Sequence, residues 1–350
     1  MRSKRVLVAP LDWGLGHASR CAPVIQGLLK KNYDVLLASS GQALVWLQSE
    51  FPDLKTYELP AYHPVYPKGS NMVLKMAMQL PKFIGAIQAE HTATQKIIVD
   101  AGIDVVIADN RYGCHSNQAK SILMTHQVNV LMPDTWKFAQ PLLNRFNHEQ
   151  IKKFDACWVP APSAQFFPAL MKVDFPVTYI GFLSRLKTET LPHKYDVVAI
   201  CTGPEPQRSI FEAMILSALK QTQLKCLVVR SKMNAPKETA QKQGRITIVN
   251  YLNSYEMSYA INQSEMVISR SGYSTVMDLM KLNKRSILVP TPGQTEQEYI
   301  GKKRSQQKLA SCVAQKDFNF QRARKETEQL TGFENYFADD TLLQNAIDTL

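Results

Sequence analysis

The sequence lacks the signatures of several large protein classes. No apolar stretch approaches the roughly 18 residues of a membrane-spanning helix, and Asp12 interrupts the first apolar run before it reaches the length of a signal-peptide core. We therefore expect a cytosolic protein. The six cysteines form no C-x-x-C pair and have no metal-like spacing to histidine, which favours buried free thiols over a zinc site.

Common catalytic motifs are absent as well. There is no G-x-x-x-x-G-K-[ST], no G-x-S-x-G and no H-E-x-x-H, which disfavours P-loop enzymes, α/β-hydrolases and zinc peptidases. No Asp-x-Asp pair occurs, which argues against a nucleotide-sugar enzyme whose metal is held by that motif. The first glycine loop reads G-x-G-H instead of G-x-G-x-x-G, which disfavours a nicotinamide dehydrogenase. The sequence therefore predicts neither a metal nor a cofactor.

The charge is basic and evenly spread. The 350 residues carry a net charge of +11, and residues 1–180 hold 18 basic and 13 acidic residues, which leaves a net +6 for the remainder. With no basic tail, this balance favours a phosphate-rich substrate or partner over nucleic acid. A hydrophobic content of 45% is sufficient for two globular domains, each with its own core.

Short β-branched runs alternate with amphipathic segments, which is typical of βαβ units and parallel sheets. A first helix is predicted at about 17–31, and the polar segment 181–194 is interpreted as a linker. We predict an α/β protein of two Rossmann-like, doubly wound domains facing a cleft, residues 1–183 and 184–350, with the last helix in the second domain or packed back on the first. The predicted strands are 6–9, 34–39, 104–108, 128–132 and 157–159, then 196–201, 224–229, 247–249, 266–269 and 286–289.

The loop after the first strand is a candidate catalytic loop, because open α/β sheets bind ligands beyond the carboxyl ends of their strands. Gly14 and Gly16 permit a tight turn, and His17 lies at a helix start. A helix N-terminus disfavours imidazolium, so a neutral His17 can accept a proton. Asp109, at the end of another strand, is placed to orient His17. The alternatives are that the glycines serve only the turn, that His17 caps the helix, and that Asp109 is an N-cap or turn residue.

Two loops of the second half are candidate phosphate sites. The loop 202–209 offers the Thr202 hydroxyl and the backbone of Gly203, although two prolines each remove a donor. In the loop 269–278, Ser271 and Gly272 precede a helix start, which favours an anion. Asp278, further along that helix, is placed to accept hydrogen bonds from ribose hydroxyls. The alternative for Asp278 is a solvated helix carboxylate.

Together these motifs resemble the GT-B glycosyltransferases of family 28, which include the transferase that adds N-acetylglucosamine to the lipid-linked peptidoglycan precursor. Gly14-x-Gly16-His17 is similar to the N-terminal glycine loop of that family. The segment 181–185 resembles an interdomain segment that ends in a diphosphate-contacting arginine, here Arg185. The similarity covers nearly the whole chain.

The donor-binding motif of the family resembles Ser269-Arg270-Ser271-Gly272 with Thr275, Val276 and Asp278, although the family usually has Glu at position 278. Gln297-Glu298-Tyr299 resembles the Gln-Gln-Tyr that ends the donor site, and Glu298 in place of a sugar-contacting glutamine leaves the donor sugar open. Tyr251, Leu252 and Met257 resemble the loop that holds the base, with an insertion. The resemblance therefore implies that the donor is bound by Gly14, Gly16, Arg185, Thr202, Gly203, Tyr251, Leu252, Met257, Ser271, Gly272, Thr275, Asp278, Gln297 and Glu298.

The resemblance implies that a hexose-type sugar is transferred from a nucleotide diphosphate sugar, expected to be UDP-linked, by metal-independent inverting displacement. His17 and Asp109 are the expected catalytic residues. A nucleotide-sugar hydrolase of the same superfamily, in which water attacks, is an alternative because residues 16–21 also resemble the start of such enzymes. A non-catalytic nucleotide-sugar-binding protein is a second alternative, and an epimerase would need several acids that the sequence does not place.

Residues 68–88 are a candidate membrane-contacting segment. Apolar residues recur at helical spacing, and Lys68, Lys75 and Lys82 are seven residues apart, so they return to one face. The resemblance places an acceptor-side membrane contact in this domain, which predicts a cell-envelope enzyme on the inner face of the membrane with a lipid-linked acceptor as one option. The alternative is an ordinary core helix with solvated lysines, and Pro81 is expected to kink or divide it.

Overall fold

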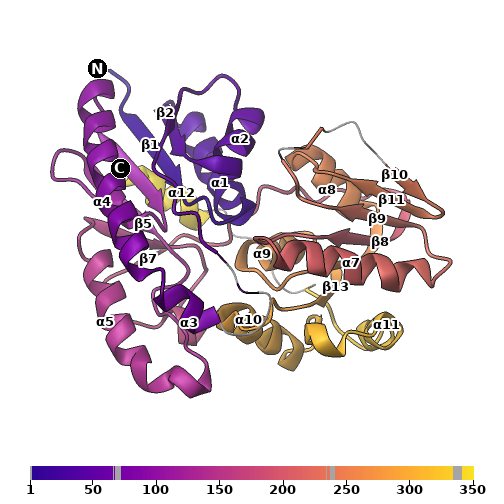
Figure 1. The fold of residues 1–350 in the computed structure, drawn as a ribbon. Helices are drawn as coiled ribbons and strands as arrows, with labels where there is room; N and C mark the ends of the chain where they lie inside the picture. The colour runs from indigo at the N-terminus through magenta and orange to yellow at the C-terminus, as the bar shows by residue number, and fades with distance from the viewer. Residues whose placement is uncertain (1, 66, 68–71, 234, 237–240, 334–340) are drawn as a thin grey trace. The chain divides into compact units, whose positions relative to one another are not determined.

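A computed structural model of the chain describes residues 2–65, 67, 72–233, 235–236, 241–333 and 341–350. The chain divides into two compact units (Figure 1). Unit 1 comprises Met1–Pro64, Met76–Ser184 and Ala338–Leu350, and unit 2 comprises Val65–Lys75 and Arg185–Phe337.

Two segments belong to a different unit from their neighbours in the sequence, and for the last helix this is one of the two predicted options. Val65–Lys75 belongs to unit 2, where the Gln207 side chain donates to the carbonyl of Pro67 at 3.1 Å. The last helix, α12 (Thr341–Asp348), belongs to unit 1, where Lys31 forms an ion pair with Asp348 at 2.7 Å.

Unit 1 contains a seven-stranded parallel sheet of order β3-β2-β1-β4-β5-β6-β7. The order reverses direction between β1 and β4, which is the point where a doubly wound sheet binds its ligand. The inner strands are buried because helices cover both faces. The strands are β1 (Arg5–Pro10), β2 (Asp34–Ser39), β3 (Thr56–Glu58), β4 (Val105–Asp109), β5 (Lys120–Met124), β6 (Ala156–Val159) and β7 (Thr178–Tyr179).

The helices of the first half follow the predicted alternation. Pro81 lies in the first turn of α4, where its missing N–H is not needed, so the predicted helical stretch is divided into α3 and α4. Gly102 ends α4 in the left-handed conformation, at φ 60°. The helices are α1 (Leu15–Lys30), α2 (Gly41–Glu50), α3 (Met72–Ala77), α4 (Leu80–Ala101), α5 (Gln140–Ile151) and α6 (Pro168–Met171), with 3₁₀ turns η1 (Tyr112–Cys114) and η2 (Asp134–Ala139).

The prediction of a strand at 128–132 is wrong, because the strand of this region is β5 and residues 128–132 are irregular. Side chains of α5 satisfy the backbone there in place of a neighbouring strand. Asn147 donates to the carbonyl of Val128 at 2.9 Å, and the Asn144 side chain accepts from the Val130 N–H at 2.8 Å. Val128 is buried and residues 129–132 are partly buried, so an apolar run can leave water without joining a sheet.

Unit 2 contains a second seven-stranded sheet, of order β10-β11-β9-β8-β12-β13-β14, and its order reverses direction between β8 and β12. All pairs are parallel except the β10–β11 hairpin. This arrangement confirms two doubly wound α/β domains. The strands are β8 (Tyr195–Ile200), β9 (Cys226–Val229), β10 (Gln241–Gln243), β11 (Ile246–Val249), β12 (Ser264–Ser269), β13 (Arg285–Leu288) and β14 (Ser311–Cys312).

The helices of unit 2 pack over a core that includes Phe211, Ile215 and Ile268. Residues 181–194 contain no helix or strand, and the N–H of Lys187 donates to the Ser258 hydroxyl at 3.0 Å, which ties the segment to α8. A capping box between Asn253 and Glu256 starts α8. The helices are α7 (Gln207–Lys220), α8 (Ser254–Asn262), α9 (Tyr273–Lys281), α10 (Thr295–Gln306) and α11 (Phe320–Thr327), with a 3₁₀ turn η3 (Gln315–Asp317).

The contact between η1 and α4 has no room for a side chain at Gly113. A methyl group on Gly113 would lie 2.4 Å from the Ile87 carbonyl oxygen and 2.9 Å from Glu90 Cβ. We expect Gly113→Ala to lower the free energy of unfolding by about 1–3 kcal/mol, because a backbone atom must move. The matched control is Gly85→Ala within α4, where a methyl group meets nothing within 4 Å and should stabilise by about 0.5–1 kcal/mol. Urea denaturation measures both, and equal stability of the two variants would contradict this packing.

Candidate active site

The predicted glycine loop lies at the carboxyl end of β1, where the first sheet reverses direction. Gly14 is the N-cap of α1 and has φ 89°, a conformation that favours glycine. His17 lies in the first turn of α1, and its side chain is 15% exposed. Gly16 is exposed, and its carbonyl accepts from the Ser19 hydroxyl at 3.1 Å. The loop thus presents His17 beside the strand ends.

Asp109, the last residue of β4, contacts His17. The distance between His17 Nδ1 and Asp109 Oδ1 is 3.3 Å, and Asp109 is fully buried. Asp109 also receives two hydrogen bonds from Arg20, which lies one helical turn after His17. The carboxylate therefore holds the side chains of α1 and does not cap a helix.

The charge of Asp109 is compensated within unit 1. Burial by itself raises the pKa of the Asp109 carboxyl, but Arg20 and then His17 outweigh burial and hold this pKa below its ordinary value. Arg20 also contacts Nδ1 of the buried His126 at 2.5 Å. The four side chains form one polar cluster at the ends of β1, β4 and β5.

A second buried arginine fixes the neighbouring loops. Arg111 Nε donates to the carbonyl of Pro10 at 2.8 Å, and Nη2 donates to the Ser40 hydroxyl at 2.9 Å. Its Nη1 pairs with Glu90 of α4 at 2.6 Å, and the pKa of Glu90 is raised by burial despite this pair. Arg111 thus holds the ends of β1 and β2 against α4.

Aromatic rings lie beside the glycine loop. The rings of Trp13 and Phe83 are 5.4 Å apart, and Tyr62 meets the ring of Trp13 edge-on at 6.2 Å. Tyr62 also donates to Glu90 at 3.0 Å, so the ring cluster is anchored to the buried ion pair. Such a cluster provides an apolar wall near the loop.

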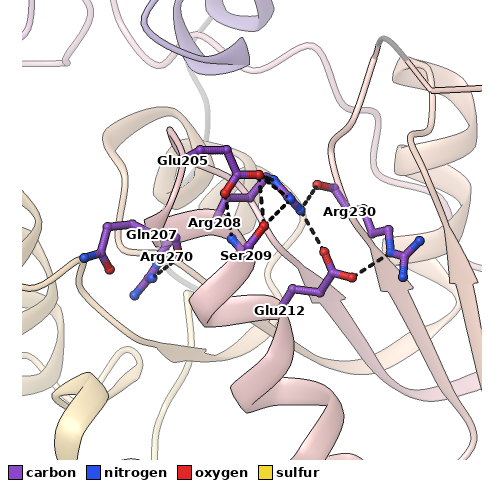
Figure 2. A network of polar contacts seen from close by, with 7 residues as sticks. All are labelled: Glu205, Gln207, Arg208, Ser209, Glu212, Arg230 and Arg270. Carbon is purple, nitrogen blue, oxygen red and sulfur yellow. Dashed lines mark hydrogen bonds and ion pairs between the residues drawn. The ribbon is translucent and has the colours of Figure 1, made fainter. Parts of the chain in front are cut away.

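In unit 2, the predicted phosphate loop follows β8 and leads into α7. Thr202 is partly buried, and Gly203 is exposed with φ 111°. Figure 2 shows the network that closes this loop. Glu205 accepts from Arg208 Nε at 2.7 Å and from the backbone N–H of Ser209 at 3.2 Å.

This network places a carboxylate of the chain itself at the start of α7. Arg208 Nη1 also donates to Glu212 at 2.7 Å, and Glu212 pairs with Arg230 at the same distance (Figure 2). A helix N-terminus attracts anions, and Glu205 already fills that role here. The Glu205 carboxylate thus lies at the α7 N-terminus, beside the loop where the sequence predicts a phosphate site, and that site stays a prediction.

The loop after β12 carries the predicted donor motif. The Ser271 hydroxyl donates to the carbonyl of Gln297 at 2.7 Å, and Gly272 is the N-cap of α9. Thr275 and Asp278 lie on α9 and are partly buried. The structure thus brings Ser271 and Gln297 together across the ends of β12 and α10.

The remaining predicted donor residues lie on three other segments. The Glu298 side chain is exposed and accepts from the Gly293 N–H at 3.1 Å. Tyr251 and Leu252 follow β11, and Met257 is buried in α8. Arg185 is the first residue of unit 2 and is partly buried.

The buried side chain of Arg270, which follows β12, contacts the loops after β8 and β13. Its guanidinium donates to the carbonyls of Gln207 and Pro290 at 3.0 and 3.2 Å, and lies 4.1 Å from the ring centre of Phe211. Burial lowers the pKa of Arg270 to about 10. Arg270 therefore supports the loops after β8 and β13 from within the core.

Several residues of these clusters were not predicted from the sequence. The set comprises Arg20, His126, Arg111, Glu90, Glu205, Glu212 and Arg230. Arg20 carried a usable signal, because residues three apart on a helix share a face with His17. Its partners Asp109 and His126 are distant in sequence, so their contact appears only in the fold.

The described ranges contain no group of three or more His, Cys, Asp or Glu side chains placed to hold a metal ion. Across the same ranges, no helix has the length and hydropathy of a membrane span.

Comparison with known families and structures identifies the type of protein. Residues 200–340 match the family described as the glycosyltransferase family 28 C-terminal domain. The fold is similar to that of the spinosyn rhamnosyltransferase SpnG, with a TM-score of 0.64, 15% identity, and 98% and 95% of the two chains covered. It is also similar to MurG of Acinetobacter baumannii, with a TM-score of 0.57, 13% identity and 99% of each chain covered. The chain is a glycosyltransferase with the GT-B fold, and its residues 200–340 form a family 28 C-terminal domain.

The sequence of this glycosyltransferase is also similar to that of one further protein over most of its length. An uncharacterized glycosyltransferase of Methanosarcina acetivorans is 22% identical over 324 residues, which covers 84% of this chain and 81% of the relative. The family 28 match includes the loops after β8 and β12 but not the loop that carries His17. The family match of this glycosyltransferase therefore does not cover His17, whose candidate role is supported by the geometry of unit 1.

Proposed function

We propose that this glycosyltransferase moves a sugar from a nucleoside diphosphate sugar to an acceptor hydroxyl by metal-independent inverting displacement. The acceptor oxygen attacks the anomeric carbon, and the bond from that carbon to the diphosphate oxygen breaks. His17 takes the proton of the acceptor hydroxyl, and the nucleoside diphosphate leaves. The contact of His17 with the buried Asp109 is the observation that carries this proposal.

The position of His17 supports its role as general base. A base must reach the proton that it removes, and His17 lies partly exposed at the end of β1 while its Nδ1 faces the cluster of Asp109 and Arg20. A neutral imidazole held by Nδ1 can present Nε2 to an acceptor, provided that the ring proton is on Nδ1.

Unit 2 provides the groups proposed to bind the donor. Asp278 of α9 is proposed to accept hydrogen bonds from the ribose, and Arg185 to contact the diphosphate. UDP remains the nucleotide expected from the family motif. Structures of SpnG and of the glycosyltransferase SsfS6 have been determined with thymidine diphosphate, so that nucleotide is the alternative.

A peripheral position on the inner face of the cell membrane, with a lipid-linked acceptor, is also proposed. The start of α4 supports it, because Leu80 and Ile84 are exposed, and Met78 just before the helix is 71% exposed. Lys82 lies between Leu80 and Ile84, and its Nζ donates to the carbonyl of His63 at 2.6 Å. Lys75 precedes these residues in the chain and belongs to unit 2, and Lys68 of the predicted basic face lies outside the described residues. Exposed apolar side chains between lysines are typical of surfaces that contact anionic lipid.

The catalytic role predicts the behaviour of a His17→Ala variant. Turnover should fall about a hundredfold or more, while donor affinity stays nearly unchanged, because only the transition state loses an interaction. His193→Ala, at an exposed position of unit 2, is the matched control and should keep full turnover. Nucleotide release from a panel of nucleotide sugars, with and without lipid extract, provides the assay. Release that needs no lipid and yields free sugar would indicate a hydrolase, and full activity of His17→Ala would remove His17 from the mechanism.

Donor binding can be tested without turnover. In calorimetric titrations, Arg185→Ala and Asp278→Ala should each weaken UDP-sugar binding at least about tenfold, because each loses a charge-assisted hydrogen bond. Asp317→Ala, at an exposed position in η3, is the control and should bind as the wild type does. Unchanged affinity in both test variants would refute the placement of the donor, and tighter binding of thymidine diphosphate than of UDP would reassign the nucleotide.

The membrane surface predicts salt-sensitive binding to vesicles. The protein should sediment with vesicles containing anionic lipid at low salt and be released as ionic strength rises, since each basic residue near such a surface contributes about 1 kcal/mol. Replacing Lys75 and Lys82 by Glu should abolish most of this binding. The charge-matched control replaces Lys220 and Lys225, which are exposed in unit 2, by Glu and should bind vesicles nearly as the wild type does. Equal sedimentation of the two double variants would argue for a soluble acceptor.

A further inference from the structure

Arg20 lies at the centre of the buried cluster that holds His17. Its guanidinium donates to both oxygens of Asp109, and its Nη2 lies 2.9 Å from His17 Nδ1. The side chains of Arg20 and Asp109 are 2% and 0% exposed, so water screens their charges very little. A change in either charge therefore changes the electrostatic potential at the His17 ring.

The groups around His17 in unit 1 come from three elements. Arg20 and Cys21 lie on α1, Asp109 ends β4, and His126 follows β5. Burial, followed by Asp109, raises the pKa of the Cys21 thiol well above its ordinary value, so Cys21 is neutral. A guanidinium only donates hydrogen bonds, so His126 Nδ1 is placed to accept from Arg20. Within the described part of unit 1, the charged groups that contact His17 are the Asp109 carboxylate and the Arg20 guanidinium.

We propose that Arg20 is a positioning residue that offsets the charge of Asp109, so that His17 meets the acceptor as a neutral base. The inference rests on the proposed role of His17. A buried carboxylate beside an imidazole favours the protonated ring, and a protonated ring cannot take the acceptor proton. The guanidinium places an opposite charge at a similar distance from His17 and removes most of this bias.

Arg20 also bears on which nitrogen of His17 carries the proton. Nδ1 lies 2.9 Å from Arg20 Nη2, which can only donate, and 3.3 Å from Asp109 Oδ1, which accepts. A proton on Nδ1 is held by Asp109 and leaves the lone pair of Nε2 for the acceptor. A lone pair on Nδ1 is held by Arg20 and places the proton on Nε2. The two partners thus compete for Nδ1, and their balance sets the fraction of the reactive tautomer.

The test follows the protonation of His17 by NMR titration in four proteins: wild type, Arg20→Gln, Asp109→Asn and the double variant. Arg20→Gln leaves the carboxylate uncompensated and should raise the midpoint of His17 by about one to two pH units. Asp109→Asn leaves the guanidinium uncompensated and should lower it by a similar amount. The double variant removes both charges and should return the midpoint to within about half a unit of the wild type. Arg20→Lys keeps the charge and is the matched control, with a midpoint near that of the wild type.

Turnover gives a second readout. The acid limb of the pH profile of kcat should move with the NMR midpoint in each variant, while donor affinity stays unchanged. A merely structural Arg20 would give a double variant worse than either single variant and no opposite shifts, and equal midpoints in all four proteins would overturn the proposal. If Arg20→Gln does not fold, Asp109→Asn tests the proposal alone. A His17 titration midpoint in this variant that is not lower than in the wild type would overturn the proposal. The titration needs no turnover, so the charge balance can hold even where His17→Ala refutes the proposed base.

Discussion

The location of the site depends on one constraint, the reversal of strand order in each sheet. Connections leave β1 and β4 in opposite directions, and the same is true of β8 and β12, so no helix covers the carboxyl ends at these two points. Loops that begin there carry His17 in unit 1 and Ser271 in unit 2. Loop chemistry can vary at these points because the buried strands beneath carry the stability.

Buried ion pairs give these loops their rigidity. Arg20 with Asp109, and Arg111 with Glu90, join strand ends to helices in unit 1, and each pair is almost fully buried. Removing one partner of such a pair leaves an uncompensated charge, which typically costs about 3–5 kcal/mol. Each of these arginines is matched by a buried acid, so the net charge of +11 lies on other basic side chains.

The starts of α7 and α9, both predicted to bind the donor, differ in whether an acidic side chain of the protein already lies there. At α7 the carboxylate of Glu205 accepts from the Ser209 N–H and from Arg208, so an internal anion fills the position that favours phosphate. At α9 the N-cap is Gly272, whose position has no side chain to compete with a ligand. This difference supports α9 as the helix that meets the donor and gives Asp278, on the same helix, its proposed contact with ribose.

The sequence by itself determined the architecture and the positions of the candidate loops at the ends of the strands. Alternating β-branched runs identified most inner strands, because burial on both faces of a parallel sheet demands such runs, and the glycines before His17 marked the turn into α1. Only the tertiary structure decided that 128–132 is not a strand, since its backbone is satisfied by Asn144 and Asn147 of α5. Tertiary structure also decided the partners of Arg20, because a contact with Asp109 across 89 residues leaves no local pattern. The charge of a buried group depends on which distant groups the fold places beside it, and the fold places Arg20 and Asp109 beside His17.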